Sequence, residues 1–326
     1  MQRRWQQQQQ QAIRDPMQLV KLLGLDETFA EHAKAAARHF PLRVPMPFAL
    51  RMEPGNPNDP LLRQILPLDA ELTPNKDYSD DPVADLQSIV APGVLHKYNG
   101  RALLTVSPVC GVHCRYCFRR EFPYEENHAG GKQQAQTLDW LAENEDINEV
   151  IFSGGDPLML SDDVLSGFVA ELEEIPHIRR VRIHTRQPIV LPSRVDSALL
   201  DWLGDTHLQT VMVLHCNHAN EIDDDVYAAM DDLRSSGTTL LNQSVLLKGV
   251  NDDIDVLCKL SEALFNGGAL PYYLNMLDKV SGSAHFDVPK KTAIALATEM
   301  RTRLPGFLVP RLVKDEPGTA AKTVVY

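Results

Sequence analysis

The sequence lacks long apolar runs and an excess of positive charge. No apolar run approaches the roughly 18 residues of a membrane-spanning helix. The first residues, MQRRWQQQQQQAIRD, contain no apolar core of a secretory signal. Their glutamine run predicts a solvated lead-in to the fold. Lys and Arg number 32 against 44 Asp and Glu, a formal net charge of −12, so the chain lacks the basic face that binding to a phosphate backbone requires. We expect no membrane segment and no nucleic-acid partner.

Cysteine is also scarce, and its placement argues against a disulfide framework. Three of the five cysteines cluster at Cys110, Cys114 and Cys117, while Cys216 and Cys258 stand alone. Thiols that stay reduced are typical of the cytoplasm, where they can hold metal. The pattern predicts a cytoplasmic protein, in which the two isolated cysteines are buried thiols.

The chain is rich in alternating strand and helix patterns from residue 101 onward. Seven stretches have strand character: RALLTV, EVIFSG, RRVRIHT, LQTVMVLH, TTLLNQSVLL, LPYYLNML and GFLVPRLV. Stretches with helical spacing separate them, such as KQQAQTLDWLAENE and DDVLSGFVAELEEI. Strict alternation predicts right-handed βαβ units and a parallel sheet, closed into a barrel or partly open, over residues 101–326. Residues 1–100, helical and then Pro-rich, predict an extension wrapped on that barrel.

Reactive side chains follow the carboxyl ends of the predicted strands, where barrel enzymes carry their active sites. The cysteine cluster follows the first strand and SGGDP, residues 153–157, follows the second. Later strand ends supply further candidates: His184, Arg186, His215, Asn217, His218, Asp278, Asp315 and Lys322. This accumulation at one rim predicts an enzyme.

Three interpretations compete for the cysteine cluster. The spacing could place three small buried residues on one helical face, although Pro108 and Gly111 favour a loop. A zinc site could recruit His113 or a distant residue, but the chain has no second CxxC pair. A [4Fe–4S] cluster held by only three thiolates would keep one iron open for a reactant.

The third interpretation agrees with a family resemblance. CxxxCxxC at Cys110, Cys114 and Cys117, with Tyr116 before the last cysteine, resembles the radical S-adenosylmethionine (SAM) enzymes. The resemblance implies a partial (β/α)6 barrel in which SAM chelates the open iron and is cleaved by one electron to a 5′-deoxyadenosyl radical. Glycine permits close approach of a ligand, and Gly154, Gly155 and Asp156 resemble the site for the SAM amino group. His215 is expected near SAM.

Residues from about Leu95 to Lys322 resemble one branch, the lysine 2,3-aminomutases, which also use pyridoxal 5′-phosphate (PLP). The motifs are CRYCFRR, IFSGGDPL, HCNHANE, LLNQSVLLKGVND, PYYLNMLDKVSGSAHF and AAKT. By this resemblance Lys322 is the PLP lysine, and Arg101, Gln243 and Lys97 face the PLP phosphate. Thr319, Ala320 and Ala321 replace a glycine run that many relatives carry before this lysine. Arg119 would bind the substrate carboxylate, and Asp278 and Asp315 its ε-ammonium.

The resemblance implies an isomerase that converts L-lysine to β-lysine, and the chain looks closest to the members that supply β-lysine for modification of translation elongation factor P. Such an enzyme needs an electron donor, for example flavodoxin or ferredoxin. Two alternatives stay open: a radical enzyme that acts on a protein-bound lysine, and a zinc-bearing RNA-binding module. The sequence admits a homo-oligomer without specifying one.

Overall fold

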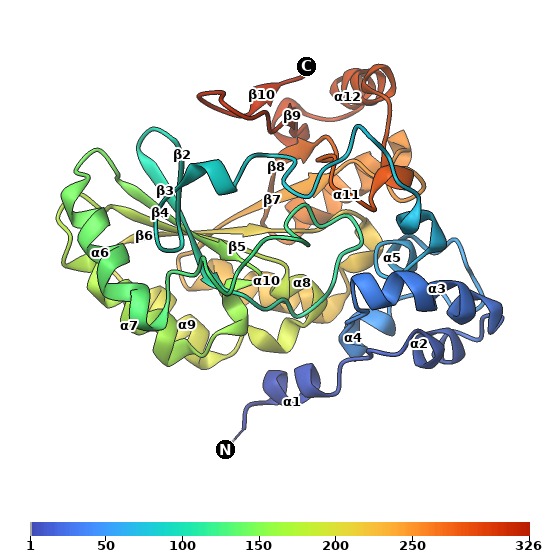
Figure 1. The fold of residues 1–326 in the computed structure, drawn as a ribbon, viewed down its shortest axis with the longest axis horizontal. Helices are drawn as coiled ribbons and strands as arrows, with labels where there is room; N and C mark the ends of the chain where they lie inside the picture. The colour runs from blue at the N-terminus through green and yellow to red at the C-terminus, as the bar shows by residue number, and fades with distance from the viewer. Residues whose placement is uncertain (1) are drawn as a thin grey trace.

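The computed structural model describes residues 2–326 and is organised around one curved, ten-stranded sheet whose strands are neighbours in chain order (Figure 1). The strands are β1 (Ile89–Ala91), β2 (Val94–Tyr98), β3 (Arg101–Ser107), β4 (Glu149–Gly154), β5 (Arg180–Thr185), β6 (Gln209–Leu214), β7 (Thr239–Val245), β8 (Leu270–Asn275), β9 (Arg311–Lys314) and β10 (Thr323–Val324). Strands β3 to β9 pair with one another in parallel, whereas β1 with β2, β2 with β3 and β9 with β10 are antiparallel pairs. The predicted α/β fold with a parallel sheet is confirmed, and all seven predicted stretches contain a strand.

Helices cover the convex side of this sheet and one of its ends (Figure 1). They are α1 (Arg4–Gln10), α2 (Pro16–Leu22), α3 (Thr28–His39), α4 (Met46–Ala49), α5 (Pro60–Arg63), α6 (Gln134–Glu143), α7 (Asp162–Glu173), α8 (Gln187–Val190), α9 (Ser197–Asp205), α10 (Asp224–Ser235), α11 (Ile254–Asn266) and α12 (Lys290–Arg303). Helix α7 shows why they pack there. It buries Leu165, Phe168, Val169 and Leu172, a stripe at helical spacing, in the core shared with the sheet.

The glutamine run is only partly the solvated lead-in that the sequence predicted: Gln7, Gln10 and Gln11 are exposed, but the run is an ordered helix that packs on the protein. It forms α1, in which Trp5 and Gln9 are buried. The two residues are four apart and therefore share one helical face. The Gln9 Nε2 donates to Oε1 of Gln187 over 3.2 Å, and the Arg194 guanidinium lies 4.8 Å from the Trp5 ring centroid. Long-range packing, rather than local composition, orders this segment.

The sheet curls until its first and last parts meet. Tyr98 ends β2, and its hydroxyl donates to Oδ1 of Asp315, just after β9, over 2.9 Å. Within residues 2–326, β1 and β10 stay as unpaired edges, so the barrel is partial, as expected. The short strands β1 and β2 lie inside the segment that we assigned to the N-terminal extension. The sheet therefore begins before residue 101, the first residue of the predicted barrel.

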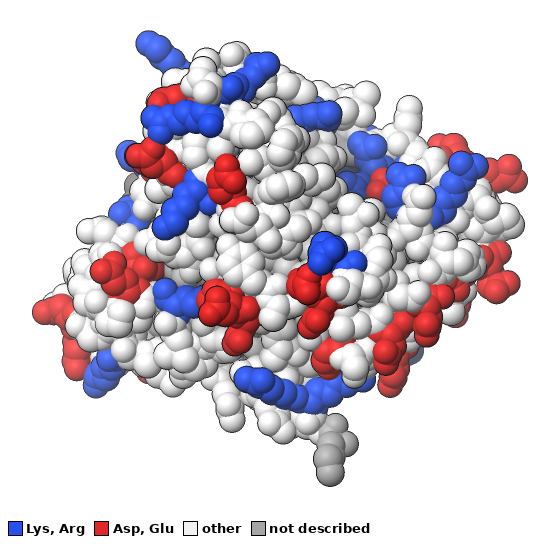
Figure 2. Space-filling model, turned by 180° about the vertical axis from the view of Figure 1, so that it is seen from behind, with Lys and Arg blue, Asp and Glu red and all other residues white. Residues whose placement is uncertain are grey.

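The described chain contains no helix long and apolar enough to cross a membrane. On the face opposite to that of Figure 1, acidic and basic side chains are interspersed, and Lys and Arg form no continuous patch there (Figure 2). This distribution agrees with the acidic net charge of −12.

Candidate active site

The concave side of the sheet encloses a cavity of about 700 Å³. Its lining includes every residue that the family resemblance assigned to a cofactor or the substrate: Lys97, Arg101, Cys110, Cys114, Cys117, Arg119, Gly154, Gly155, Asp156, His215, Gln243, Asp278, Asp315 and Lys322. Of the other strand-end candidates, His184, Arg186 and Asn217 also line it, whereas His218 does not. Parallel strands direct their carboxyl ends to one rim, which brings together loops far apart in sequence. The role of each residue depends on the contacts that it makes within the cavity.

The three clustered cysteines lie on the loop after β3, and their side chains are unpaired with one another. One tight turn joins two of them, because the Cys117 amide donates to the Cys114 carbonyl over 3.1 Å. Burial raises the pKa of Cys117 to about 11 and raises that of Cys110 well above its ordinary value. In the metal-free protein these two thiols are therefore protonated, and binding of a cluster would release their protons. Three soft sulfur donors facing one cavity fit an iron–sulfur cluster.

The N-terminal segment holds this loop in place through a buried ion network. The Arg115 side chain is completely buried, and its Nε and Nη2 donate to the two Glu71 carboxylate oxygens over 2.8 and 2.6 Å. Arg120 Nη2 donates to the same carboxylate over 3.0 Å. Both guanidinium groups also lie within 5 Å of the Phe40 ring centroid, at 4.7 and 4.5 Å. Glu71 thus pairs with two buried cations beside the cysteines and compensates one of their two positive charges.

The two glycines of SGGDP allow the loop after β4 to lie directly on the cysteine loop. A Cβ at Gly154, whose φ is +115°, would lie 2.5 Å from the Ser107 carbonyl oxygen. A Cβ at Gly155 would lie 2.6 Å from the Val109 carbonyl oxygen. The Gly155 amide donates to the Ser107 carbonyl over 2.7 Å. The glycines therefore serve an approach between two backbones, in addition to any approach to a ligand.

The Asp156 carboxylate accepts hydrogen bonds from other residues of the protein. Its carboxylate accepts from the Leu158 amide, the Thr185 hydroxyl and the Arg186 amide, at 3.0, 2.7 and 2.8 Å. Burial raises its pKa to about 6, against the lowering effect of these donors. Asp156 thus ties the loop after β4 to the loop after β5. Its expected contact with the SAM ammonium stays a prediction.

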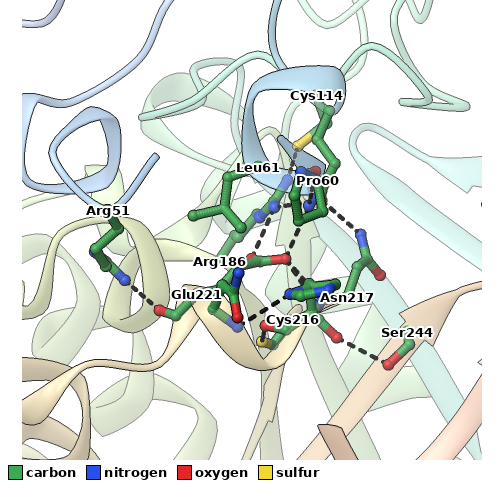
Figure 3. A network of polar contacts seen from close by, with 12 residues as sticks. Arg51, Pro60, Leu61, Cys114, Arg186, Cys216, Asn217, Glu221 and Ser244 are labelled. Carbon is green, nitrogen blue, oxygen red and sulfur yellow. Dashed lines mark hydrogen bonds and ion pairs between the residues drawn. The ribbon is translucent and has the colours of Figure 1, made fainter. Parts of the chain in front are cut away.

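Arg186 is the centre of the polar network in Figure 3. Its Nη1 lies 2.7 Å from the Cys114 sulfur and 2.7 Å from the Tyr116 hydroxyl. Its Nη2 donates to Oε1 of Gln64 over 2.8 Å and to Oε2 of Glu221 over 2.9 Å. Three loops and the N-terminal segment are therefore joined by one buried guanidinium next to a predicted cluster ligand.

His215 and Gln243, predicted near different cofactors, contact each other. The Gln243 Nε2 lies 2.8 Å from the His215 Nε2, and burial lowers the pKa of His215 to about 3. The imidazole is therefore neutral and accepts this bond through Nε2. Of the two isolated cysteines, Cys216 is buried as predicted, whereas Cys258 is only partly buried on α11, so that prediction is wrong for Cys258.

Lys322 lies beside the carboxylates that the sequence assigned to the substrate ammonium. Its Nζ donates to Oδ2 of Asp315 over 2.9 Å, while Tyr98 donates to the other oxygen over 2.9 Å. The Asp278 carboxylate has no hydrogen-bond or ion-pair partner among the described residues, although the Asp278 backbone carbonyl accepts from the Val280 amide over 2.7 Å. Burial raises its pKa to about 7, with Lys322 lowering it and Asp315 raising it.

Arg119 and Lys97 share a carboxylate that sequence reasoning missed. The Arg119 Nε donates to Oδ2 of Asp85 over 2.6 Å, and the Lys97 Nζ lies 2.6 Å from the other oxygen. Burial raises the pKa of Asp85, but the two cations outweigh it and the pKa lies below its usual value. Asp85 comes from the acidic stretch NKDYSDDPVADL, in which no spacing distinguishes it from its neighbours.

Comparison with known proteins gives a consistent picture. Residues 104–260 match the model of the radical SAM superfamily. Proteins named L-lysine 2,3-aminomutase are similar over nearly the whole chain. That of Escherichia coli is 47% identical over 98% of this chain and 93% of its own, and that of Haemophilus influenzae 47% over 96% and 93%. The Clostridium subterminale protein is 32% identical over 98% of this chain and 77% of its own. The chain belongs to the lysine 2,3-aminomutase family of radical SAM enzymes.

Proposed function

We propose that this chain is an isomerase that moves the amino group of L-lysine from Cα to Cβ and forms β-lysine. The relatives that share 43 to 47% of its sequence over nearly its full length carry the name L-lysine 2,3-aminomutase. The contact of Lys322 with Asp315 is the observation that carries the proposal. Through this contact the cavity pairs the ammonium group of a lysine side chain with a carboxylate. The ε-ammonium of substrate lysine needs a contact of the same kind.

Family membership implies a [4Fe–4S] cluster, SAM and PLP. We assign the cluster to Cys110, Cys114 and Cys117, and SAM to the neighbouring Gly154, Gly155, Asp156 and His215. We assign the PLP aldehyde to Lys322, and the PLP phosphate to Lys97, Arg101 and Gln243. When bound, these groups supply a carbon radical that abstracts hydrogen and a conjugated ring that carries the migrating nitrogen.

The residues of the chain position lysine in this cavity and exclude water from it. Asp278 and Asp315 bind the ε-ammonium, which requires Lys322 to leave Asp315 and become available to PLP. Arg119 binds the α-carboxylate through the guanidinium edge that Asp85 leaves free. Because hydrogen abstraction needs no strong general base, positioning and shielding are the protein's main contribution.

We infer that the substrate is the free amino acid. Arg119 offers a buried cation to a carboxylate, which a lysine inside a polypeptide lacks. The resemblance to the family members that supply β-lysine for modification of elongation factor P supports that role for this chain, and flavodoxin or ferredoxin is a suitable reductant. The free cysteines support the cytoplasm as the location that we propose for the enzyme. We further propose residues 101–326 as the catalytic unit and 1–100 as an extension that supports the cysteine loop and contributes Lys97 to the cavity.

The test is anaerobic incubation of the reconstituted protein with SAM, dithionite and L-lysine, followed by chiral analysis of the product. Borohydride reduction of the PLP-loaded protein and peptide mapping should place the adduct on Lys322. Lys314→Ala is the matched control, since Lys314 pairs with Glu316 over 3.1 Å and does not line the cavity. An adduct on Lys314 or Lys248, or absence of β-lysine, would contradict the proposal.

A further inference from the structure

The residue between the two predicted anion-binding cations is itself an anion. Asp85 is 2% exposed and lies between Arg119 and Lys97, with one carboxylate oxygen 2.6 Å from each cation. It is contributed by the segment before the sheet rather than by a strand of the barrel. The position of this carboxylate bears on how Arg119 can receive a substrate.

The orientation of Arg119 is set by two contacts. Its Nε donates to Asp85 over 2.6 Å and its Nη1 donates to the Ser153 hydroxyl over 3.0 Å. The described residues provide no hydrogen-bond acceptor for Nη2. Since each terminal nitrogen carries two N–H groups, the edge formed by Nη1 and Nη2 still offers donors to a carboxylate. Asp85 therefore occupies the Nε side and leaves the end of the fork available.

Lys97 is held by the same segment. Its Nζ contacts Asp85 Oδ1 at 2.6 Å and donates to the Val83 carbonyl over 2.7 Å. Two of its three N–H groups are thus engaged by residues 83 and 85. One carboxylate compensates two cations, so that a single positive charge remains for an incoming carboxylate.

The backbone is bent to deliver this side chain. Ala84, with φ +52°, is the only non-glycine residue of positive φ in residues 2–326. Such a conformation is unfavourable for alanine and persists only where the surroundings impose it. Asp81 accepts from the Asp85 amide over 2.8 Å and from the Leu86 amide over 3.1 Å, which fixes the turn.

The acidic segment, residues 78–88, also reaches the other substrate-facing loop. Ser79 donates to the Lys279 carbonyl over 2.9 Å and accepts from the Ser281 amide over 3.0 Å, beside Asp278. In Figure 1 this cyan stretch crosses from α5 toward β2 over the ends of β7 and β8. The same segment thus contacts the loop of Asp278 and the side chain of Arg119.

We propose that Asp85 is a positioning residue for substrate: it orients Arg119, and with it Lys97, so that the free guanidinium edge receives the α-carboxylate of the amino acid. This inference rests on the proposed function. Asp85 itself acts through Arg119 and contacts no reacting atom. A competing role is that Asp85 fills the carboxylate site of the empty enzyme and has to be displaced.

The experiment compares Asp85→Asn with Asp80→Asn, which removes the same charge from an exposed position of the segment. Anaerobic initial rates over a lysine series should show KM raised about tenfold or more in Asp85→Asn, with a smaller change in kcat. Asp80→Asn should match the wild type. Cluster absorbance and reductive cleavage of SAM without lysine should be unchanged, because the cysteine loop keeps its own support.

A double-mutant cycle with Arg119→Lys tests whether Asp85 acts through Arg119. The two changes should be non-additive, the double variant resembling Arg119→Lys alone. A wild-type KM in Asp85→Asn, or full additivity, overturns the proposal. A lowered KM also overturns it and identifies Asp85 as the competitor. If Asp85→Asn fails to fold, Asp85→Glu provides the comparison, since it keeps the charge and should shift KM in the same direction by displacing Arg119. Absence of lysine turnover by the wild type would instead refute the proposed function.

Discussion

Replacement of Asp278 with asparagine tests how the cavity recognises the distal ammonium of lysine. Asp278 lines the cavity beside Lys322 and Asp315, and burial raises its pKa to about 7. Lys322 and Lys97 lower this pKa, whereas Asp315 and Asp85 raise it. In the empty enzyme the carboxyl group is therefore partly protonated at neutral pH. A protonated carboxyl group cannot form an ion pair with an ammonium.

The pKa determines the size of the expected effect. With a pKa of about 7, roughly one carboxylate in eleven is ionised at pH 6 and about ten in eleven at pH 8. We expect kcat/KM for lysine, which reports the free enzyme, to rise about tenfold between these pH values. Asp278→Asn should lose this rise and lower kcat/KM at pH 8 by about tenfold or more, since a charge-assisted contact is worth about 1.5–3 kcal/mol.

The raised pKa of Asp278 also affects the stability of the folded protein, and this effect weakens with rising pH whereas lysine binding strengthens. A carboxyl group whose pKa rises from 3.8 to about 7 on folding binds its proton more tightly in the native state. Its favourable contribution is full below pH 3.8 and is lost as the pH rises through 7. The shift corresponds to about 4 kcal/mol, which cavity water screens to about 1–3 kcal/mol. Asp278→Asn should therefore stabilise the substrate-free protein at pH 8 while impairing lysine binding.

The assay is anaerobic turnover over a lysine series at pH 6, 7 and 8, with thermal unfolding of each variant without substrate. Asp139→Asn, an exposed carboxylate on α6, controls for the loss of one charge. SAM cleavage should change less than lysine turnover. Wild-type lysine dependence in Asp278→Asn at every pH would refute the assignment of Asp278 to the substrate ammonium.

Three further predictions concern the architecture around the cavity. Alanine at Cys110, Cys114 or Cys117 should abolish iron retention after reconstitution, while Cys216→Ala and Cys258→Ala should retain it; equal iron loss in Cys216→Ala would contradict the three-thiolate site. Gly155→Ala should destabilise the protein by about 1–3 kcal/mol in urea unfolding, because its Cβ would lie 2.6 Å from the Val109 carbonyl oxygen. Gly167→Ala on α7, with no atom within 4 Å of the new Cβ, should instead be neutral or stabilise by up to about 1 kcal/mol. Glu71→Gln should lower stability by about 3–5 kcal/mol, since Arg115 and Arg120 would lose their buried carboxylate, and an unchanged urea midpoint would show that water replaces it.

Local sequence patterns were sufficient to predict the architecture of the barrel and the residues that line its cavity. The period of apolar residues distinguishes strands from helices, as in α7, and alternation of the two dictates a parallel sheet. Once the strands are parallel, their carboxyl ends share one rim, so motifs at strand ends must meet. For this reason Cys110, Asp156, His215 and Asp278, each on the loop after a different strand, line one cavity.

The partners of those residues depended on tertiary structure. Asp85 approaches Arg119 because the N-terminal segment crosses the rim of the sheet, and Tyr98 approaches Asp315 because the sheet curls. Lys322 meets Asp315 more locally, through the antiparallel pairing of β9 with β10. Buried charges select whichever opposite charge the fold brings within reach, and no local spacing encodes that choice. The glutamine run is a similar case, since Trp5 and Gln9 are ordered by the surface against which they pack. The sequence thus determined which side chains surround the cavity, and the tertiary contacts decided which of them are held and which are free to bind.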